Sequence, residues 1–296
     1  MKHPILHIGY AKTGTTWFQE DFYPNVNNIN FFRQNTVLED IITEYDSEKI
    51  HAKYSFDKRS VFCDENILGN VLFGSSSTKE ITLRLKKIFP NGKVVIFIRN
   101  QLDLIASAYS QHIKSGGTFG IKRFFEQTKY INFYHQSFFL YEYFQFHEII
   151  CFYIEVFGKE NVHVFAYEDF LEDNYQFLTN YTKILNLDVD LEKISFNKKN
   201  IKLRKRLFRF IKFSNHFTKK NTFYKQYYFH IPFLYNLINY NLDILNKYKI
   251  FGKPYKPIEI IGKKNYKFLY DFYKESNNIL YDKIGLESMK KHAYPM

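Results

Sequence analysis

Short apolar runs alternate with helix-like segments along the first 170 residues of the chain. Five runs of five to seven residues have the length and the flanking polar positions of strands. They lie at Pro4–Gly9, Ile29–Arg33, Ser60–Asp64, Lys93–Arg99 and Asn161–Tyr167. The run KVVIFIR at 93–99 is continuous and rich in β-branched residues, which is typical of a strand buried on both faces of a parallel sheet.

The segments between these runs predict helices. They cover Thr15–Tyr23, Ser77–Phe89, Gln101–Ser115 and a long Ser137–Phe157. Beyond residue 170 the pattern is mainly helical, with helices expected at Glu172–Leu187, in a basic segment at 198–220, and at 224–248 and 265–283. Strands that alternate with helices predict βαβ units, and hence a three-layer α/β/α fold with a central parallel sheet. We expect one domain over residues 1–296, with an α/β core at 1–170 and a helical extension at 171–296.

Composition narrows the class of protein. The chain is 45% apolar and 24% charged, as in ordinary globular proteins. Its two cysteines, Cys63 and Cys151, lie far apart, which argues against a disulfide framework or a paired cysteine metal site. The first residues lack the apolar core of a secretory signal, and no run of about 18 apolar residues occurs. We therefore expect a cytoplasmic protein.

Charge points to anionic ligands or surfaces. The net charge is +12, and residues 198–220 hold ten Lys or Arg residues and no acid. Within Ile201–Phe213, a helical projection places the basic residues on one face: Lys202, Lys205, Arg206, Arg209 and Lys212. The apolar residues fall on the other: Leu203, Leu207, Phe210 and Ile211. Such a helix fits four alternative roles. It is exposed to solvent without a ligand, it covers a bound phosphate of the donor, it forms part of a groove for an anionic glycan, or it adheres to an acidic membrane surface.

The stretch GYAKTGTTWFQ joins the first predicted strand to the first predicted helix. A loop in this position directs several backbone N–H groups at one point, where the helix dipole also favours an anion. Gly9 and Gly14 give the backbone room to curl. Hydroxyl donors and one cation complete the set: Thr13, Thr15, Thr16 and Lys12. The loop indicates a phosphate site, although Gly and Thr also occur in plain turns.

The loop differs from that of nucleotide triphosphatases. Their pattern, G-x-x-x-x-G-K-[ST], has the lysine directly after the second glycine. Here Thr15 follows Gly14, and Lys12 comes two residues before that glycine. Only VFCD at 61–64 offers an acidic residue at a strand end that could hold Mg²⁺ beside the loop. This pattern disfavours an ATPase.

A second anion site is predicted where KVVIFIRNQLDLIASAYS passes from strand to helix. Arg99 ends the strand, and Ser107 follows eight residues later. Asn100 and Asp103 suit the start of the helix, because they match a capping box. Ligands of open α/β sheets bind at the carboxyl ends of the strands, where Arg99 and the first loop both emerge. Together they predict a ligand with two separated anionic groups, although Arg99 alone suits a structural ion pair equally well.

These motifs resemble those of sulfotransferases. AKTGTTWF is similar to the family's 5′-phosphosulfate loop, and RNQLDLIASAY to its 3′-phosphate motif. VHVFAYEDFLEDNYQFLTNYTKILNLD is similar to a less specific third stretch, and the three cover about a quarter of the chain. The chain departs from the pattern at Ala11 and Gln101, where the family usually has proline. Because these prolines mainly stiffen turns, their loss bears on loop rigidity.

The resemblance implies a fold related to P-loop kinases and a donor, 3′-phosphoadenosine 5′-phosphosulfate (PAPS). It implies that Lys12 contacts the phosphosulfate bridge and that Thr13, Gly14, Thr15 and Thr16 hold the 5′-phosphate. Arg99 and Ser107 would then hold the 3′-phosphate. Trp17 is assigned either to the adenine or to the core. Lys199 and Arg204, at the start of the basic segment, fall where related enzymes complete the donor site.

The acceptor must lose a proton, so a base is expected opposite the donor. Glu65 is our candidate, because it follows the strand SVFCD and because family members often have an acidic residue there. Asp64 or Glu65 as a plain helix cap is the alternative. His112, on the Ser107 helix, is the other candidate base, with a favourable charge at a helix end as its alternative. We expect His7 to be structural and no metal to be needed.

The resemblance thus predicts a PAPS-dependent sulfotransferase with a small-molecule donor and an acceptor hydroxyl, for which a saccharide is the favoured source. A P-loop kinase shares the fold and predicts Mg²⁺ and ATP dependence. A basic protein that binds nucleic acid or a membrane surface predicts salt-dependent binding without turnover. We expect no specific nucleic-acid partner, but a peripheral contact of 198–220 with an anionic membrane or glycan is consistent with the charge.

Overall fold

The structure is a computed structural model of the chain. It describes residues 3–33, 40, 43–44, 46–54, 59–68, 78–125, 141–196, 202–220 and 226–296. The chain forms two compact units that do not follow chain order. Unit 1 comprises Met1–Gln101, Glu142–Asn197 and Phe272–Met296, and unit 2 comprises Leu102–Tyr141 and Lys198–Asp271. This division differs from the expected boundary at residue 170, because later segments return to complete unit 1.

Unit 1 contains a sheet of five parallel strands in the order β2-β3-β1-β4-β5. The strands are β1 (Ile5–His7), β2 (Asn30–Arg33), β3 (Ser60–Cys63), β4 (Lys93–Ile98) and β5 (Val162–Ala166). In the central strand, His7 is in register with Cys63 of β3 and Val95 of β4. All five predicted strands are confirmed, each slightly shorter than its apolar run.

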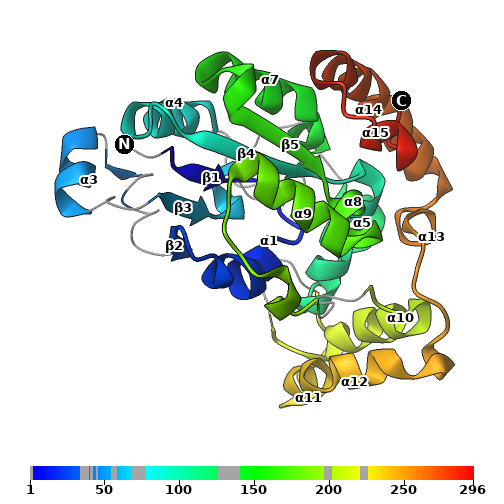
Figure 1. Ribbon diagram of the computed structural model, residues 1–296. Helices are drawn as coiled ribbons and strands as arrows, with labels where there is room; N and C mark the ends of the chain where they lie inside the picture. Colours follow the sequence, from blue (N-terminus) through cyan, green and yellow to red (C-terminus); the bar gives the residue numbers. More distant parts are fainter. Residues whose placement is uncertain are drawn as a thin grey trace. The chain divides into compact units, whose positions relative to one another are not determined.

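Helices cover both faces of the sheet (Figure 1). On one face lie α1 (Thr15–Trp17), the π-helical turn η1 (Phe18–Phe22) and α9 (Asn174–Leu185), whose aromatic side chains form the main core. On the other lie α4 (Thr78–Ile88) and α7 (Phe146–Phe157). Right-handed crossovers require this arrangement, since the chain moves one way from β1 to β2 and the other way from β3 through β5. The predicted three-layer α/β/α class is confirmed.

Several helices differ in extent from the sequence prediction. The segment Thr15–Tyr23 begins as α1, widens into η1 and ends as a 3₁₀ turn at Tyr23–Asn25, where Pro24 interrupts the backbone donors. The helix expected at Glu172–Leu187 corresponds to α9. A separate short helix, α8 (Tyr167–Glu172), precedes it, because Asp173 between them is extended and caps α9. The start expected at Ser137 lies outside the described residues, and the helix observed there, α7, begins at Phe146.

The remaining elements complete the two units. Before residue 200 they are α3 (Ser47–Lys53), η3 (Glu65–Leu68), α5 (Gln101–Lys114), α6 (Ile121–Phe124), η4 (Tyr141–Phe144), η5 (Lys159–Asn161) and η6 (Leu191–Lys193). After residue 200 they are α10 (Lys205–Ser214), η7 (Asn215–Phe217), α11 (Leu234–Tyr240), α12 (Leu242–Lys247), η9 (Lys249–Phe251), α13 (Pro257–Ile261), α14 (Lys263–Ile284) and α15 (Ser288–Lys291). None of the described helices is long and apolar enough to span a bilayer.

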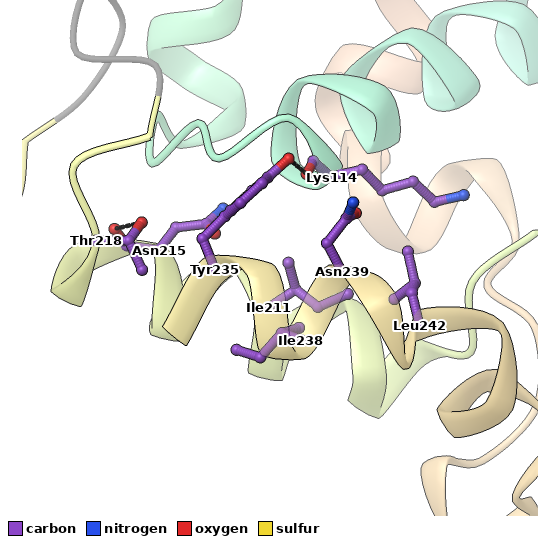
Figure 2. Close-up of a pocket in the computed structure, with 8 residues that line it drawn as sticks. All are labelled: Lys114, Ile211, Asn215, Thr218, Tyr235, Ile238, Asn239 and Leu242. Carbon is purple, nitrogen blue, oxygen red and sulfur yellow. Dashed lines mark hydrogen bonds between the residues drawn. The ribbon is translucent and has the colours of Figure 1, made fainter. Parts of the chain in front are cut away.

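Unit 2 is helical. Its α10 and α11 pack together and enclose a small cavity, shown in Figure 2. Tyr235 of α11 donates a hydrogen bond across it to the Lys114 carbonyl at the end of α5 (3.1 Å). Asn215 follows α10 and donates to the carbonyls of Ile113 and Gly117, both at 2.8 Å. These bonds tie α5, α10 and α11 into one helical unit.

Candidate functional site

The carboxyl ends of the parallel strands in unit 1 gather the predicted site residues at one edge of the sheet. The loop 8–14 follows β1, Glu65 follows β3, Arg99 follows β4, and Tyr167 follows β5. The crossovers leave β1 toward one face and leave β3 and β4 toward the other, so this edge is a topological switch point. Ligands of open α/β sheets bind at such points.

The backbone of the loop is shaped by two glycines and one strained residue. Gly9 approaches β4 so closely that a Cβ there would lie 2.5 Å from the Phe97 nitrogen. Lys12 and Gly14 both adopt left-handed φ angles, 70° and 88°. A Cβ on Gly14 would lie 2.7 Å from the Tyr167 ring. A non-glycine residue at positive φ is held there by its surroundings, which is a frequent feature of ligand-binding loops.

Two threonines in the loop have distinct surroundings. The Thr13 side chain is fully buried, and its hydroxyl donates to the Tyr10 carbonyl within the loop. Thr16 is exposed at the start of α1. The loop therefore uses the Thr13 hydroxyl to hold its own shape, and the role of Thr13 in binding a phosphate through that hydroxyl stays a prediction.

Two cations and one carboxylate converge at this edge. Arg99 donates from Nη1 to the Lys12 carbonyl (3.0 Å), and its guanidinium lies 5.3 Å from the centre of the Tyr167 ring. Lys12 is half-buried, and burial lowers its pKa. The Glu65 carboxylate opposes that shift in the pKa of Lys12, and Arg99 adds to it. A loop cation thus lies within the electrostatic influence of both an acid and a second cation.

Glu65 and Asp64 have different roles. Asp64 accepts hydrogen bonds from the backbone and side chain of Asn66, at 2.8 and 3.0 Å, and so caps the turn η3. Burial raises the pKa of Glu65, while Lys12 and the neighbouring Thr15 hydroxyl lower it. A half-buried carboxylate with a raised pKa beside a lysine has the properties of a general base. Of the two acidic residues, Asp64 therefore caps the turn, and Glu65 does not have that role.

Trp17 lies in the core of unit 1. Its side chain is buried, its indole N–H donates to the Ser195 carbonyl (3.1 Å), and its ring stacks on Phe196 with centres 6.0 Å apart. Of the two positions that the sequence left open, the structure favours the core over the adenine. His7 is likewise structural, since it is buried, shares a hydrogen bond with the Tyr23 hydroxyl (2.9 Å), and burial lowers its pKa to about 3.

Two predicted residues belong to α5 within unit 2. Ser107 is half-buried in the second turn of that helix. His112 is buried against Tyr109, Phe119 and Phe124, and Gly117 lies against its ring. Burial, aided by Lys212, lowers the pKa of His112 to about 4. This lowered pKa disfavours a charged His112 at the helix end, and the surroundings of His112 are those of a packed residue.

The basic segment differs in part from its prediction. Lys199 lies outside the described residues. The Arg204 side chain donates to the carbonyls of Asn246 (2.7 Å) and Gly252, and these bonds favour a structural role for Arg204. Phosphate binding by Arg204 stays a prediction. In α10, Phe208 is buried and Phe210 is exposed. The expectation that Phe210 packs inward was wrong, because the buried face of α10 is formed by Phe208 together with Leu207 and Ile211.

The sequence reasoning missed two partners of the site. Tyr167 packs on both Arg99 and Gly14, and two signals in the sequence point to it: it follows β5 directly, and it lies in the third stretch that resembles sulfotransferases. Asn100, expected at the helix start, donates through its side chain to the carbonyls of His292 (3.3 Å) and Ala293 (2.9 Å). The residue beside Arg99 is thus held by the last segment of unit 1.

One group in the described residues has the spacing of a metal site. Ligand atoms of Asp169, Glu172 and His292 lie within 4.8 Å of one another. Lys291 forms an ion pair with Glu172 and lies 3.9 Å from Asp169, while His292 contacts Asp169 at 2.8 Å. The lysine supplies the positive charge that a metal would bring, so these contacts form an ion-pair network.

Comparison with known proteins gives a family. Residues 2–223 match the family described as "Sulfotransferase domain". Among curated proteins, none matches the chain. A sulfotransferase structure from Alicyclobacillus acidocaldarius aligns with a TM-score of 0.50 and 16% identity, over 68% of this chain and 87% of that one. The structure of mouse sulfotransferase SULT7A1 complexed with PAP aligns with a TM-score of 0.50 and 15% identity, over 100% of this chain and 90% of that one.

The structural neighbours share the fold, and the family match spans three quarters of the sequence, including the loop at Gly9–Thr16, Glu65 and Arg99. The sulfotransferase motifs that the sequence displays lie at the edge of the sheet where ligands bind. The chain therefore belongs to the sulfotransferase domain family and is a transferase.

Proposed function

We propose that the chain transfers a sulfonyl group from PAPS to an acceptor hydroxyl, with saccharides as the first class of acceptor to test. The observation that carries this proposal is the convergence of Lys12, Glu65 and Arg99 at the carboxyl edge of the sheet. Family membership favours sulfonyl transfer over the phosphoryl transfer of a P-loop kinase. A cytoplasmic location remains a prediction from the sequence.

The site residues suit a donor with separated anionic groups. The loop backbone between Lys12 and Thr16 leads into α1 and offers N–H groups to a 5′-phosphate. Arg99 offers a bidentate cation for a 3′-phosphate, and the role of Ser107 as a second donor stays a prediction from the sequence motif. The neighbour complexed with PAP, the donor without its sulfonyl group, supports this choice of ligand.

The proposed chemistry divides between two side chains. Glu65 accepts the proton of the acceptor hydroxyl as that oxygen forms its bond to sulfur. Lys12 stabilises the negative charge that grows on the bridging oxygen as the old S–O bond breaks. Glu65 raises the pKa of Lys12 and Lys12 lowers the pKa of Glu65, so each group favours the charged form of the other, against the effect of burial. Burial raises the pKa of Glu65, which makes it a stronger base than an exposed carboxylate.

The test is thermal shift with the product 3′-phosphoadenosine 5′-phosphate (PAP), and separately with ATP and Mg²⁺. A ligand at about 100 times its Kd adds roughly 2.7 kcal/mol of stability. We expect PAP to stabilise the wild type, and Arg99→Ala to weaken PAP binding by about 10- to 100-fold, because a charge-assisted contact contributes about 1.5–3 kcal/mol.

The matched control is Arg84→Ala, which removes an arginine from α4 that pairs with Glu80. It should leave the PAP-induced shift unchanged. Stabilisation by ATP and Mg²⁺ but not by PAP would revive the kinase. Incubation of the wild type with PAPS and a panel of saccharides and simple alcohols, followed by mass spectrometry for a gain of one sulfonyl group, then identifies the acceptor class.

A further inference from the structure

The net positive charge of the protein comes from unit 2. That unit holds 22 Lys and Arg residues and five acidic residues, whereas unit 1 holds 20 and 25. Unit 2 is therefore strongly cationic and unit 1 is slightly anionic. The stretch 226–256 within unit 2 contains Asp243 as its one acidic residue. A cationic unit of this kind attracts anionic surfaces.

The helices α11 and α12 have two apolar faces. One face points into unit 2, where Tyr235 and Ile238 of α11 line the cavity beside Ile211 of α10, as Figure 2 shows. The opposite face follows the helical spacing of four, three and four residues and points outward. It consists of Phe233, Leu237, Tyr240 and Ile244, which we call the α11–α12 stripe.

The stripe is exposed to an unusual degree. The side chains of Phe233, Leu237, Tyr240 and Ile244 are 81%, 63%, 87% and 51% exposed. Phe233 also has a left-handed φ of 63°, a conformation that is unfavourable for residues other than glycine. Tyr248 and Ile250 are also exposed and follow the stripe in the sequence, where the exposed cations Lys247 and Lys249 alternate with them. Exposed apolar side chains gathered on one face and flanked by polar residues mark an interaction site.

The chemistry of the stripe selects one partner. A second copy would bring the same cationic unit into contact with itself, and like charges oppose that contact. A glycan or a nucleic acid would pair with the lysines and stack on the aromatic rings, but Leu237 and Ile244 offer such ligands no matching group. A bilayer with anionic headgroups takes apolar side chains into its acyl boundary while the lysines contact the headgroups.

We propose that the α11–α12 stripe of unit 2 inserts into the surface of an anionic lipid bilayer, with Lys247 and Lys249 on the headgroups. This differs from adhesion through the basic segment 198–220 alone, because insertion of the stripe depends on apolar residues outside that segment. The proposal is independent of the proposed transfer reaction, since it uses no residue of the site in unit 1.

The experiment measures co-sedimentation of the full chain with vesicles. One set contains phosphatidylglycerol and phosphatidylcholine, and the other contains phosphatidylcholine alone. We expect binding to the anionic set only, weakened by salt because screening shortens the range of attraction. Leu237→Ser/Tyr240→Ser should weaken binding at least about tenfold, because two apolar side chains no longer leave water. The matched control Leu83→Ser/Tyr175→Ser removes two side chains in unit 1, each 55% exposed, and should bind as the wild type does.

A second readout does not depend on the double variant. Trp17 is the only tryptophan and is buried, so Tyr240→Trp adds one exposed fluorophore to the stripe. Its emission should shift to shorter wavelength with anionic vesicles, whereas that of Tyr175→Trp should not.

The proposal is overturned by no binding to anionic vesicles, by equal binding of the stripe variant and the wild type, by an unshifted Tyr240→Trp spectrum, or by a concentration-dependent dimer that the stripe substitutions abolish. Heparin or RNA binding that matches vesicle binding and ignores the stripe substitutions also overturns it, because charge alone would then account for the interaction.

Discussion

Replacement of Gly9 by alanine tests the close approach of the loop to β4. The new Cβ would lie 2.5 Å from the Phe97 nitrogen, and that atom belongs to a buried strand backbone that cannot swing aside. The two strands must separate. Two hydrogen bonds flank the position, from Ile8 to Val95 (3.0 Å) and from Tyr10 to Phe97 (3.2 Å), and both would lengthen.

The expected loss can be assembled from these contacts. Each weakened backbone bond contributes about 1 kcal/mol to the free energy of unfolding. Forcing a methyl group into a packed core costs about 1–3 kcal/mol more. Gly9→Ala should therefore lower the free energy of unfolding by roughly 3–5 kcal/mol, a large part of the about 5–15 kcal/mol that holds a domain together.

Urea denaturation followed by Trp17 fluorescence measures this loss, because Trp17 lies in the core of unit 1. The matched control is Gly120→Ala, since Gly120 has a φ of −69° and a Cβ added there would meet only the Lys212 amine, at 4.0 Å. The control should change stability by less than about 1 kcal/mol. If Gly9→Ala proves as stable as that control, the inferred contact between loop and strand does not exist.

Two further substitutions test the charge states. Because burial raises the pKa of Glu65, the folded state holds its proton more tightly than the unfolded state does, and the stabilisation from that proton is lost as pH rises through the folded pKa. Glu65→Gln should thus become more stable than the wild type as pH rises above the ordinary glutamate range. Its rate of sulfonyl transfer should fall about 10²- to 10⁴-fold, and the decrease of that rate at low pH should disappear. Unchanged activity would remove Glu65 from the mechanism. For His112 the sign is reversed, because a pKa lowered to about 4 gives stabilisation that is present above pH 6.5 and is lost as pH falls toward 4. Thermal melts of His112→Phe across that range should show a shallower decline than the wild type, by on the order of 1 kcal/mol per pH unit, and parallel declines would contradict its burial as a neutral group.

The sequence was most informative where one physical signal dominates. Continuous apolar runs such as KVVIFIR predict buried parallel strands, and the five strands appear where expected. The loop at Gly9–Thr16 could be placed because glycine, threonine and lysine between a strand and a helix have few other uses. The carboxyl edge of a parallel sheet then brings Glu65 and Arg99 to the same place without any knowledge of their contacts.

Other features depend on contacts between distant segments. Trp17 has neighbours, Ser195 and Phe196, that lie about 180 residues further along the chain, and only the fold brings them together. In α10, neighbouring aromatic residues satisfy the helical period almost equally, so periodicity alone could not decide between Phe208 and Phe210. The pKa of His112 depends on burial beneath Gly117, which no local pattern reveals.

The last segment of unit 1 has a consequence for how the protein is made. Asn100 and Glu168 are held by residues near the end of the chain, through the carbonyl of Ala293 (2.9 Å) and the hydroxyl of Tyr294 (2.8 Å). A nascent chain is synthesised from its N-terminus onward. The strands of the sheet are therefore complete before most of unit 2 and the last segment of unit 1 have been made. The backbone beside Arg99 gains these partners only after residue 294 has been added, so this part of the sheet edge is fixed after unit 2 has been synthesised.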